Sequence, residues 1–592
     1  MTPLLILEGG LWLAVLGTSL AWTDALLAEY VLPKLLLLSL AVLVCAVGTA
    51  LSRRSGPRFV RPTALDPPLL CVGAALLLST AFSQDRLLSV LGHYNSHVLG
   101  VWPLLLCAAV YYSTAWRAGV GGVKRVLRVC LVAGAVVGAY ALLQAAGLEV
   151  FPRVAKLPQG RAISTIGGPV FLGAYLAVLL PLALHWFLSG GRERVFGGVC
   201  VALMAGGLWA TASRGSWLGA AAGCVAYGAL RHGFRQPRWS GKEWLFAACL
   251  VAVLGGLAVL GLSTRDIRWH EAPRLEIWKA AVQTFQGAPL LGSGPDTFEL
   301  GFRRFRTDQF IRWVNVLVFQ IHAHNDILQA LATTGIVGFS CWLFLLVGLV
   351  RAALRGLRAS EGRLLAAALS AGLLSLFVHM KFNPAGIGAI VVAAVFAGHL
   401  CRPTGEGASP QPAFWLVGAV LALGILSVSL ASRMVWADRQ MKRGLAHQKV
   451  GNEGVAYAYF KSAVRLNRCE LEYRRQIVNH LIEWAYGGPG GEVRAELFDV
   501  AAGHAATAMD CHPNDMYAHY ILGVSLLMQA QAGRSERLEP AENALDEALQ
   551  RDSLYLPLIE ARLRAARLRG DQALAERLSS RVEYVESLMR PE

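Results

Sequence analysis

Residues 321–339 read IHAHNDILQALATTGIVGF and place a polar cluster directly at the mouth of a long apolar helix. The cluster holds His322, His324, Asn325 and Asp326. Polar groups this close to lipid are costly, so they usually serve a function. The simpler alternative is an ordinary helix cap, in which Asn325 or Asp326 accepts hydrogen bonds from the first amide groups.

The composition around this stretch is that of a membrane protein. Of 592 residues, 55% are hydrophobic and 16% are charged, with a mean hydropathy of +0.47, which excludes an ordinary soluble enzyme. The net charge is +16. In a membrane protein, basic residues first report topology and anionic lipid headgroups, so we do not predict nucleic-acid binding.

Apolar runs long enough to cross about 30 Å of hydrocarbon recur along the chain. They begin near residues 4, 32, 67, 98, 126, 168, 195, 216, 244, 326, 362, 385 and 413. The first run lacks a basic leader and a small-residue cleavage site, so we expect a retained span and no signal peptide. The pattern predicts an all-α polytopic membrane protein with about thirteen spans.

Every second loop between these runs is basic, which predicts the topology. The basic loops lie near residues 53–61, 117–128, 192–194, 231–242 and 351–363. By the positive-inside rule these loops are cytoplasmic. The N-terminus is then cytoplasmic, and everything after about residue 433 is extracytoplasmic.

The composition changes near residue 433, which predicts two domains: a membrane domain over 1–433, including a long extracytoplasmic loop at 264–325, and a soluble helical domain over 434–592. In the second domain small and apolar residues recur at helical spacing: Ala456, Phe460 and Ala463, then Ala501, Ala505 and Ala508, then Ala541, Leu545 and Ala548. This region resembles degenerate tetratricopeptide repeats, and the alternative is any small antiparallel helical domain. Cys469 and Cys511 are able to pair if the domain is extracytoplasmic.

Several arginines lie on the predicted outer side, against the topological bias. Arg161 and Arg214 stand next to spans, and Arg274 opens an amphipathic segment in the long loop. Planar guanidinium groups suit phosphate oxygens, and a lipid-linked diphosphate would supply such a partner. For Arg214 the alternative is a snorkelling anchor at a short turn.

A second group of outer arginines alternates with aromatic residues and predicts a different role. Its members are Arg303, Arg304, Arg306 and Arg312, with Phe302, Phe305, Phe310 and Trp313. We expect an interfacial amphipathic helix lying on anionic headgroups. We do not assign catalysis to these arginines.

Motifs for nucleotide or metal chemistry are missing from the sequence. No Gly-rich loop ends in Lys-Ser/Thr, and GSGPDTF at 292–298 is read as a turn. No Asp-x-Asp pair lies on a predicted outer loop to hold a divalent metal. We therefore expect neither a cofactor nor a metal site, and arginine cations in place of a metal.

At this point four motifs resemble those of the bacterial O-antigen ligase and O-antigen polymerase superfamily. HNDILQALATTGIVG carries Gly335 and Gly338 at a spacing that lets another helix approach closely, and SRGSWLG carries Arg214 and Leu218. STIGGPVFLGAYLAVLLP and PLLGSGPDTF are similar to two further segments of the family. Gly168 departs from the family pattern, because many relatives have Asn-Pro where this chain has Gly-Pro.

The resemblance implies a GT-C-like, metal-independent, inverting glycosyltransferase of the bacterial cytoplasmic membrane, as in lipopolysaccharide or polysaccharide biosynthesis. The implied donor is a glycan on undecaprenyl diphosphate. Its diphosphate would be neutralised by Arg161, Arg214 and Arg274, while His324 takes the proton of the attacking acceptor hydroxyl. The lower-ranked candidates are His322, Asn325 and His379, and an ordinary interfacial histidine is the simpler interpretation of His379.

Several functions remain open on the sequence. Within the superfamily, the acceptor is a glycolipid, a growing glycan or a protein hydroxyl, which distinguishes a ligase, a polymerase and a protein O-oligosaccharyltransferase. A transporter is disfavoured because the polar residues gather at one membrane face, whereas transport sites lie near the midplane. A membrane-anchored scaffold explains neither His324 nor the arginines. The repeat-like domain is expected to bind the acceptor or a protein partner.

Overall fold

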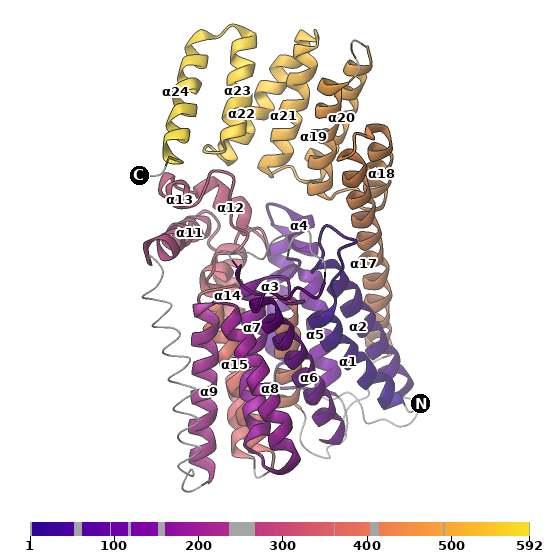
Figure 1. The fold of residues 1–592 in the computed structure, drawn as a ribbon, viewed down its shortest axis with the longest axis vertical. Helices are drawn as coiled ribbons and strands as arrows, with labels where there is room; N and C mark the ends of the chain where they lie inside the picture. The colour runs from indigo at the N-terminus through magenta and orange to yellow at the C-terminus, as the bar shows by residue number, and fades with distance from the viewer. Residues whose placement is uncertain are drawn as a thin grey trace.

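A computed structural model describes residues 3–52, 62–94, 96–116, 120–151, 160–235, 267–359, 361–402, 414–488, 490 and 492–590. The described residues form helices joined by turns and contain no strand (Figure 1). Eight of these helices are long and apolar enough to cross a membrane. The predicted all-α polytopic fold is therefore confirmed.

Twelve helices form the apolar bundle, and they begin close to twelve of the thirteen predicted starts. They are α1 (Pro3–Leu20), α2 (Leu32–Ser52), α3 (Asp66–Ala81), α5 (Val101–Ala115), α6 (Val120–Ala145), α7 (Pro169–Phe187), α8 (Gly191–Ala210), α9 (Arg214–Arg235), α14 (Asp326–Arg358), α15 (Arg363–Met380), α16 (Ile387–Leu400) and α17 (Phe414–Gln448). The helix expected near residue 244 lies outside the described residues. The apolar helices α3, α5 and α16 are shorter than the eight candidate spans.

The two ends of the bundle differ in what they carry (Figure 1). Four further helices lie at one end: α4 (Arg86–Leu91), α11 (Ile267–Gly287), α12 (Phe298–Phe305) and α13 (Asp308–Trp313). Basic loop residues gather at the other end, where Arg125 pairs with Glu8 at 2.6 Å and Arg128 pairs with Glu193. Which end faces the cytoplasm stays a prediction.

A stack of helices covers the end of the bundle that carries α4, α11, α12 and α13 (Figure 1). We call this stack, residues 453–588, the array. It consists of α18 (Glu453–Leu466), α19 (Leu471–Gly487), α20 (Glu492–Cys511), α21 (Met516–Gln531), α22 (Leu538–Arg551), α23 (Leu556–Arg569) and α24 (Gln572–Leu588). All nine recurring small and apolar residues noted in the sequence are fully buried in the core of the array. A disulfide joins Cys469 to Cys511. The tetratricopeptide resemblance itself stays a prediction.

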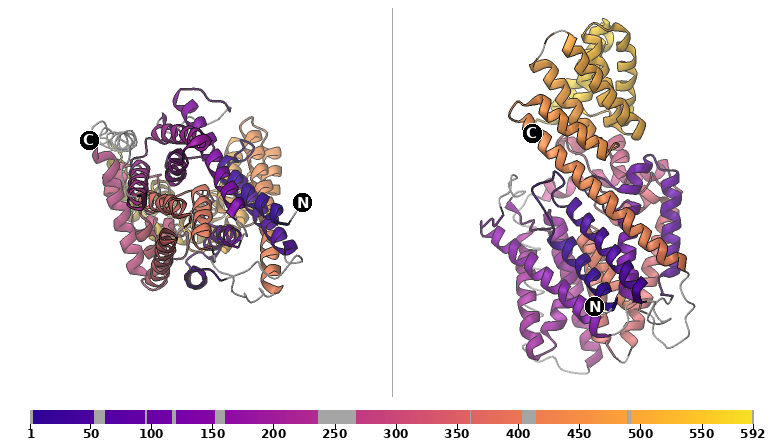
Figure 2. Two further views of the ribbon diagram at one scale, coloured as in Figure 1. Left: turned by 90° about the horizontal axis from the view of Figure 1, so that it is seen from below. Right: turned by 90° about the vertical axis from the view of Figure 1, so that its right-hand side faces the viewer.

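The array is joined to the bundle by one continuous helix. The predicted boundary near residue 433 falls inside α17, which runs from the bundle into the array (Figure 2). On this helix Asp438 is buried, and its carboxylate accepts hydrogen bonds from the amides of Leu27 and Ala28 and from the hydroxyls of Tyr94 and Tyr473. These bonds fix the base of the array against the bundle.

Two of the aromatic-flanked arginines also join the array to the bundle. The Arg306 Nε donates to Asp552 of the array at 2.9 Å, and the Arg303 guanidinium lies 4.4 Å from the ring centre of Tyr517. Both arginines are buried. The expectation that they lie on lipid headgroups is therefore wrong, because their partner is an acidic residue far away in the sequence. Arg304 and Arg312 are exposed.

Candidate active site

The polar cluster of residues 322–326 begins helix α14. The Asn325 side chain accepts hydrogen bonds from the amides of Ile327 and Leu328 at 3.0 and 3.2 Å, so it is the N-cap of the helix. The Asp326 carboxylate instead pairs with Lys381 at 2.6 Å. The simpler interpretation of Asn325 as a cap is thus what the structure shows, and the cap fixes the backbone directly after His324.

Helix α14 is broken at Gly335, where φ is 64° and ψ is −168°. The amides of Ile336 and Val337 donate to the carbonyls of Pro289 and Leu290 at 2.9 and 3.2 Å. A Cβ at Gly335 would lie 2.3 Å from the Leu290 oxygen, so only glycine fits this contact. We expected another helix to approach here, and this was wrong, because the approaching element is a turn.

That turn, residues 289–297, is held against α14 by backbone hydrogen bonds. The amides of Ser293 and Gly294 donate to the carbonyls of Ala332 and Thr333 at 3.0 and 2.9 Å. Asp296 follows with a positive φ of 57°, and its Oδ2 accepts a hydrogen bond from the His93 amide at 2.7 Å. The turn therefore carries a buried carboxylate to the side of α14 on which His324 lies.

A cavity of about 350 Å³ opens between these elements. Its polar wall carries Asp296, His322, His324, Asn325 and Asn383. Its apolar wall comes from α3, α5, α14 and α16, with Val72, Ala75, Leu76, Leu104, Trp342, Leu345 and Ile390. A cavity with one polar and one apolar wall suits an amphiphilic ligand with a polar head and a hydrocarbon tail.

Four buried polar atoms around this cavity have no hydrogen-bond partner among the described residues. They are the Nδ1 atoms of His322 and His324, the Nε2 of Gln329 and the Oδ1 of Asp296. Buried polar atoms are nearly always paired in folded proteins. Their concentration at one cavity makes it a candidate site for a polar ligand.

The two histidines of the cluster are held in their neutral form. Burial, and then the nearby Arg274 charge, lowers the pKa of His324 to about 4. Burial, and then His324, lowers the pKa of His322 to about 3. The Nε2 of His324 lies 3.2 Å from the Gln320 side-chain oxygen. A neutral imidazole is able to accept a proton, which is what the predicted role of His324 requires.

Asn383 brings two of the predicted arginines to this cavity. The Arg274 Nη2 donates to the Asn383 side-chain oxygen at 3.3 Å. Arg214 is the first residue of α9, and a Cβ at the next residue, Gly215, would lie 2.4 Å from the Asn383 nitrogen. The Arg161 Nε donates to the Thr211 carbonyl in the turn before α9, at 2.8 Å. Arg274 therefore contacts a residue that lines the cavity, whereas Arg214 and Arg161 lie at and beside the start of α9, next to Asn383 in the case of Arg214.

The sequence of this region resembles that of a known family. Residues 199–343 match the family model described as O-antigen ligase. This part of the chain is similar to O-antigen ligases. Arg214, Arg274 and His324 all fall within the matched residues. The match supports the resemblance to the O-antigen ligase and polymerase superfamily, and the eight candidate spans agree with a multi-pass membrane protein.

Comparisons with curated proteins and with solved structures do not extend this assignment. No curated protein matches the chain. A solved structure titled "MamA RS-1 ArsTM double mutant" aligns over 28% of this chain and 86% of its own, with 16% identity and a TM-score of 0.22. A TM-score this low establishes no shared fold.

His379 lies outside the matched residues but packs directly against them. Its Nδ1 lies 3.1 Å from the Ser216 hydroxyl on α9, and its Nε2 lies 3.2 Å from the Pro384 carbonyl. The side chain is fully buried. With both nitrogens engaged, His379 positions the loop that carries Asn383, in agreement with its simpler interpretation.

The sequence analysis did not predict two residues that line the cavity: Asn383 and Asp296. Asn383 lies in HMKFNP at residues 379–384, where the predicted candidate was His379. Asp296 stands in GSGPDTF, which was read as a turn. The available signal was an acidic residue after two glycines, at a position that tolerates positive φ.

Proposed function

We propose that the protein transfers a glycan from undecaprenyl diphosphate to an acceptor hydroxyl at the outer face of the bacterial cytoplasmic membrane. One observation carries this proposal. His324 lines a cavity whose other wall is apolar, and the Arg274 charge acts on His324 and bonds to Asn383 of the same lining, inside or beside the residues that match the O-antigen ligase model. An amphiphilic donor with a charged diphosphate fits that arrangement.

The proposed reaction is a single displacement without a metal. The acceptor oxygen forms a bond to the anomeric carbon as the bond from that carbon to the diphosphate oxygen breaks, which inverts the configuration. The acceptor proton passes to neutral His324. Fixed cations at Arg161, Arg214 and Arg274 stabilise the charge that develops on the leaving diphosphate. His322 is the second candidate base.

The array is proposed to lie outside the cytoplasm, with the N-terminus inside. The disulfide between Cys469 and Cys511 supports this side, because disulfides persist in oxidising compartments. In this position the array covers the end of the bundle that carries the cavity and is placed to bind an acceptor or a partner protein. Protease added to intact spheroplasts should remove the array, and full protection would contradict the topology.

The transfer reaction is tested with purified protein, an undecaprenyl-diphosphate-linked oligosaccharide and candidate glycolipid, glycan and protein acceptors. His324→Ala removes the base and should slow transfer about 10²–10⁴-fold. Arg214→Ala removes a cation that stabilises the leaving diphosphate and should also slow turnover. Arg304→Ala, which changes an exposed arginine of the long loop, is the control and should retain activity.

Two results would contradict the proposal. If His324→Ala and Arg214→Ala both consume donor as fast as the unchanged protein, the mechanism fails. If no acceptor is modified while the lipid-linked glycan crosses between leaflets of a vesicle, the protein is a transporter. The acceptor that is modified distinguishes ligase, polymerase and protein glycosylation.

A further inference from the structure

We propose that Asp296 is a substrate-contacting residue of this cavity, and that its Oδ1 accepts a hydrogen bond from a carbohydrate hydroxyl of the donor or the acceptor. The inference deepens the proposed glycosyl transfer and rests on it. Asp296 is 2% exposed and lines the cavity together with His322 and His324. It belongs to neither the arginine set nor the histidine pair.

The two carboxylate oxygens of Asp296 are in different situations. Oδ2 accepts the hydrogen bond of the His93 amide, whereas Oδ1 is buried and has no hydrogen-bond partner among the described residues. An ionised carboxylate only accepts hydrogen bonds, so Oδ1 requires a donor. Sugar hydroxyls are such donors, and the other unpaired polar atoms of the cavity can bond to the same ligand.

The backbone around Asp296 is shaped to present this carboxylate. Asp296 has a φ of 57°, which is costly for a residue with a side chain, and such conformations gather at functional sites. The preceding Gly294 has a φ of 118°, and a Cβ there would lie 2.0 Å from the Ser83 hydroxyl. Gly92 has a φ of 84°, and a Cβ there would lie 3.1 Å from the Asp296 Oδ2. Two glycines thus allow the close approach that holds the carboxylate in place.

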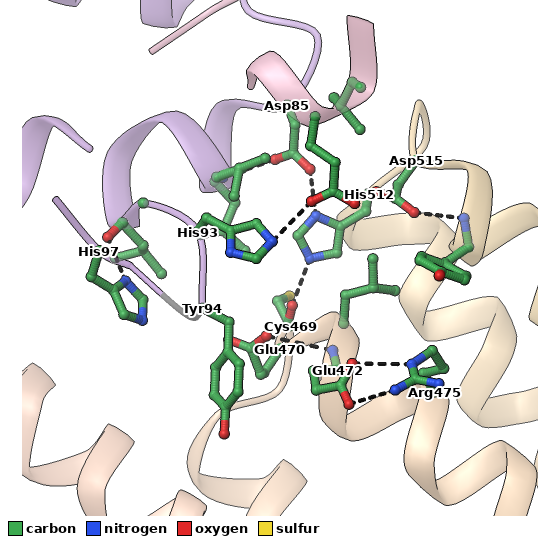
Figure 3. Close-up of a pocket in the computed structure, with 18 of the residues that line it drawn as sticks. Asp85, His93, Tyr94, His97, Cys469, Glu470, Glu472, Arg475, His512 and Asp515 are labelled. Carbon is green, nitrogen blue, oxygen red and sulfur yellow. Dashed lines mark hydrogen bonds and ion pairs between the residues drawn. The ribbon is translucent and has the colours of Figure 1, made fainter. Parts of the chain in front are cut away.

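Among the described residues, no lysine or arginine acts on Asp296 as a counter-charge that would explain its burial as structural. The nearest titratable groups are His93 and Glu299, and the His93 Nε2 pairs with Glu299 at 2.9 Å. Figure 3 shows the His93 ring turned into the pocket between the bundle and the array. His93 therefore bonds to Asp296 through its backbone amide, while its ring pairs with Glu299.

The charge of Asp296 suits a hydroxyl acceptor near neutral pH. Burial raises the pKa of Asp296 to about 6, although the His93 amide and charge act in the opposite direction. The carboxyl is therefore mostly ionised at pH 7 and loses its charge as the pH falls through about 6. This gives the hydrogen bond to a hydroxyl a pH dependence that the neutral histidines of the cavity do not have.

The test compares Asp296→Ala and Asp296→Asn with the unchanged protein, varying donor and acceptor separately. Because the lost hydrogen bond is to a charged group, kcat/KM should fall about 10–100-fold in Asp296→Ala. The fall should appear when the donor is varied if the hydroxyl belongs to the donor, and when the acceptor is varied if it belongs to the acceptor. Asp296→Asn keeps an acceptor oxygen and should lose less. Asp510→Ala, on an exposed face of α20, is the matched control.

A second readout separates substrate contact from a structural role and from failure of the proposed function. The kcat/KM of the unchanged protein should decline below about pH 6, and Asp296→Asn should remove that decline. Saturation-transfer NMR with the free oligosaccharide tests binding without turnover, and Asp296→Ala should weaken its signal. If both variants retain kcat/KM, the pH profile and the NMR signal while His324→Ala is inactive, the Asp296 inference is overturned and glycosyl transfer stands. If the unchanged protein transfers nothing, the proposed function fails, and an unaltered NMR signal in Asp296→Ala would overturn the inference as well.

Discussion

At the residue scale, Asn325 shows how a capping side chain serves a neighbouring functional group. Asn325→Ala removes the acceptor of the Ile327 and Leu328 amides, which should cost about 1 kcal/mol of stability. Because the cap fixes the backbone next to His324, turnover should fall as well. Asn325→Asp keeps an acceptor oxygen and should retain both. Thermal unfolding in detergent and donor turnover measure the two effects. Equal loss of turnover in both variants, at an unchanged melting temperature, would mean that Asn325 contacts substrate.

Some of the candidate site residues could be predicted from the sequence and others could not. His324, Arg214 and Arg274 were predictable, because polar and basic residues beside apolar runs are uncommon and carry the family motifs. Asp296 was not, because its role depends on the His93 amide, 203 residues earlier in the chain. A sequence pattern reports local chemistry, whereas burial and an unpaired oxygen follow from the packing of distant segments.

At the scale of the element, the break in α14 gives a sharp prediction for Gly335. Gly335→Ala would place a Cβ 2.3 Å from the Leu290 carbonyl, in a backbone conformation that other residues rarely adopt. We expect a loss of about 1–3 kcal/mol or more and displacement of the turn that carries Asp296. Gly73→Ala, on α3, where a Cβ meets nothing within 4 Å, is the matched control. Thermal unfolding of both variants tests this, and equal stability would show that the turn is not held at Gly335.

The positions of the helices could be predicted from the sequence, whereas the break within α14 could not. Twelve helix starts followed from hydropathy, because a span needs a long apolar run. The break at Gly335 did not follow, because the apolar pattern continues through it from Leu331 to Leu349. Backbone pairing between α14 and the 289–297 turn leaves no periodic signal in either segment.

At the scale of the whole molecule, the array is part of the structure around the site and is not a loosely tethered module. The sequence predicted helices with buried small residues there, and their burial is confirmed. It did not predict where the array sits. That placement depends on pairs such as Arg306 with Asp552, which lie 246 residues apart, and on Asp438 beside the loop before α2. Arginines flanked by aromatic residues look the same in sequence whether they meet lipid or protein.

The contact between the array and the bundle should depend on pH through His512. Its Nδ1 lies 2.5 Å from the Asp85 carboxylate, and its Nε2 lies 2.6 Å from the Cys469 carbonyl (Figure 3). Burial alone lowers the pKa of His512, but the hydrogen bond and charge of Asp85 outweigh burial and raise the pKa to about 9, from an ordinary value of 6.5. Because the raised pKa belongs to the folded state, the stabilisation is complete below about pH 6.5 and is lost as the pH rises through about 9.

Hydrogen exchange in the segment between α20 and α21 measures this contact, from pH 7.5 to 9.5 after correction for intrinsic exchange rates. Protection should decline across that range in the unchanged protein. Asp85→Asn removes the counter-charge of His512. It should therefore lower protection already at pH 7.5, by about 3–5 kcal/mol, which is typical of breaking a buried ion pair. Its protection should then decline less between pH 7.5 and 9.5 than that of the unchanged protein. Part of the decline should persist, because Glu299 raises the pKa of His93 at the same interface against the effect of burial. Protection that is flat with pH in the unchanged protein, or an equal decline in both proteins, would show that Asp85 and His512 do not hold the array in place.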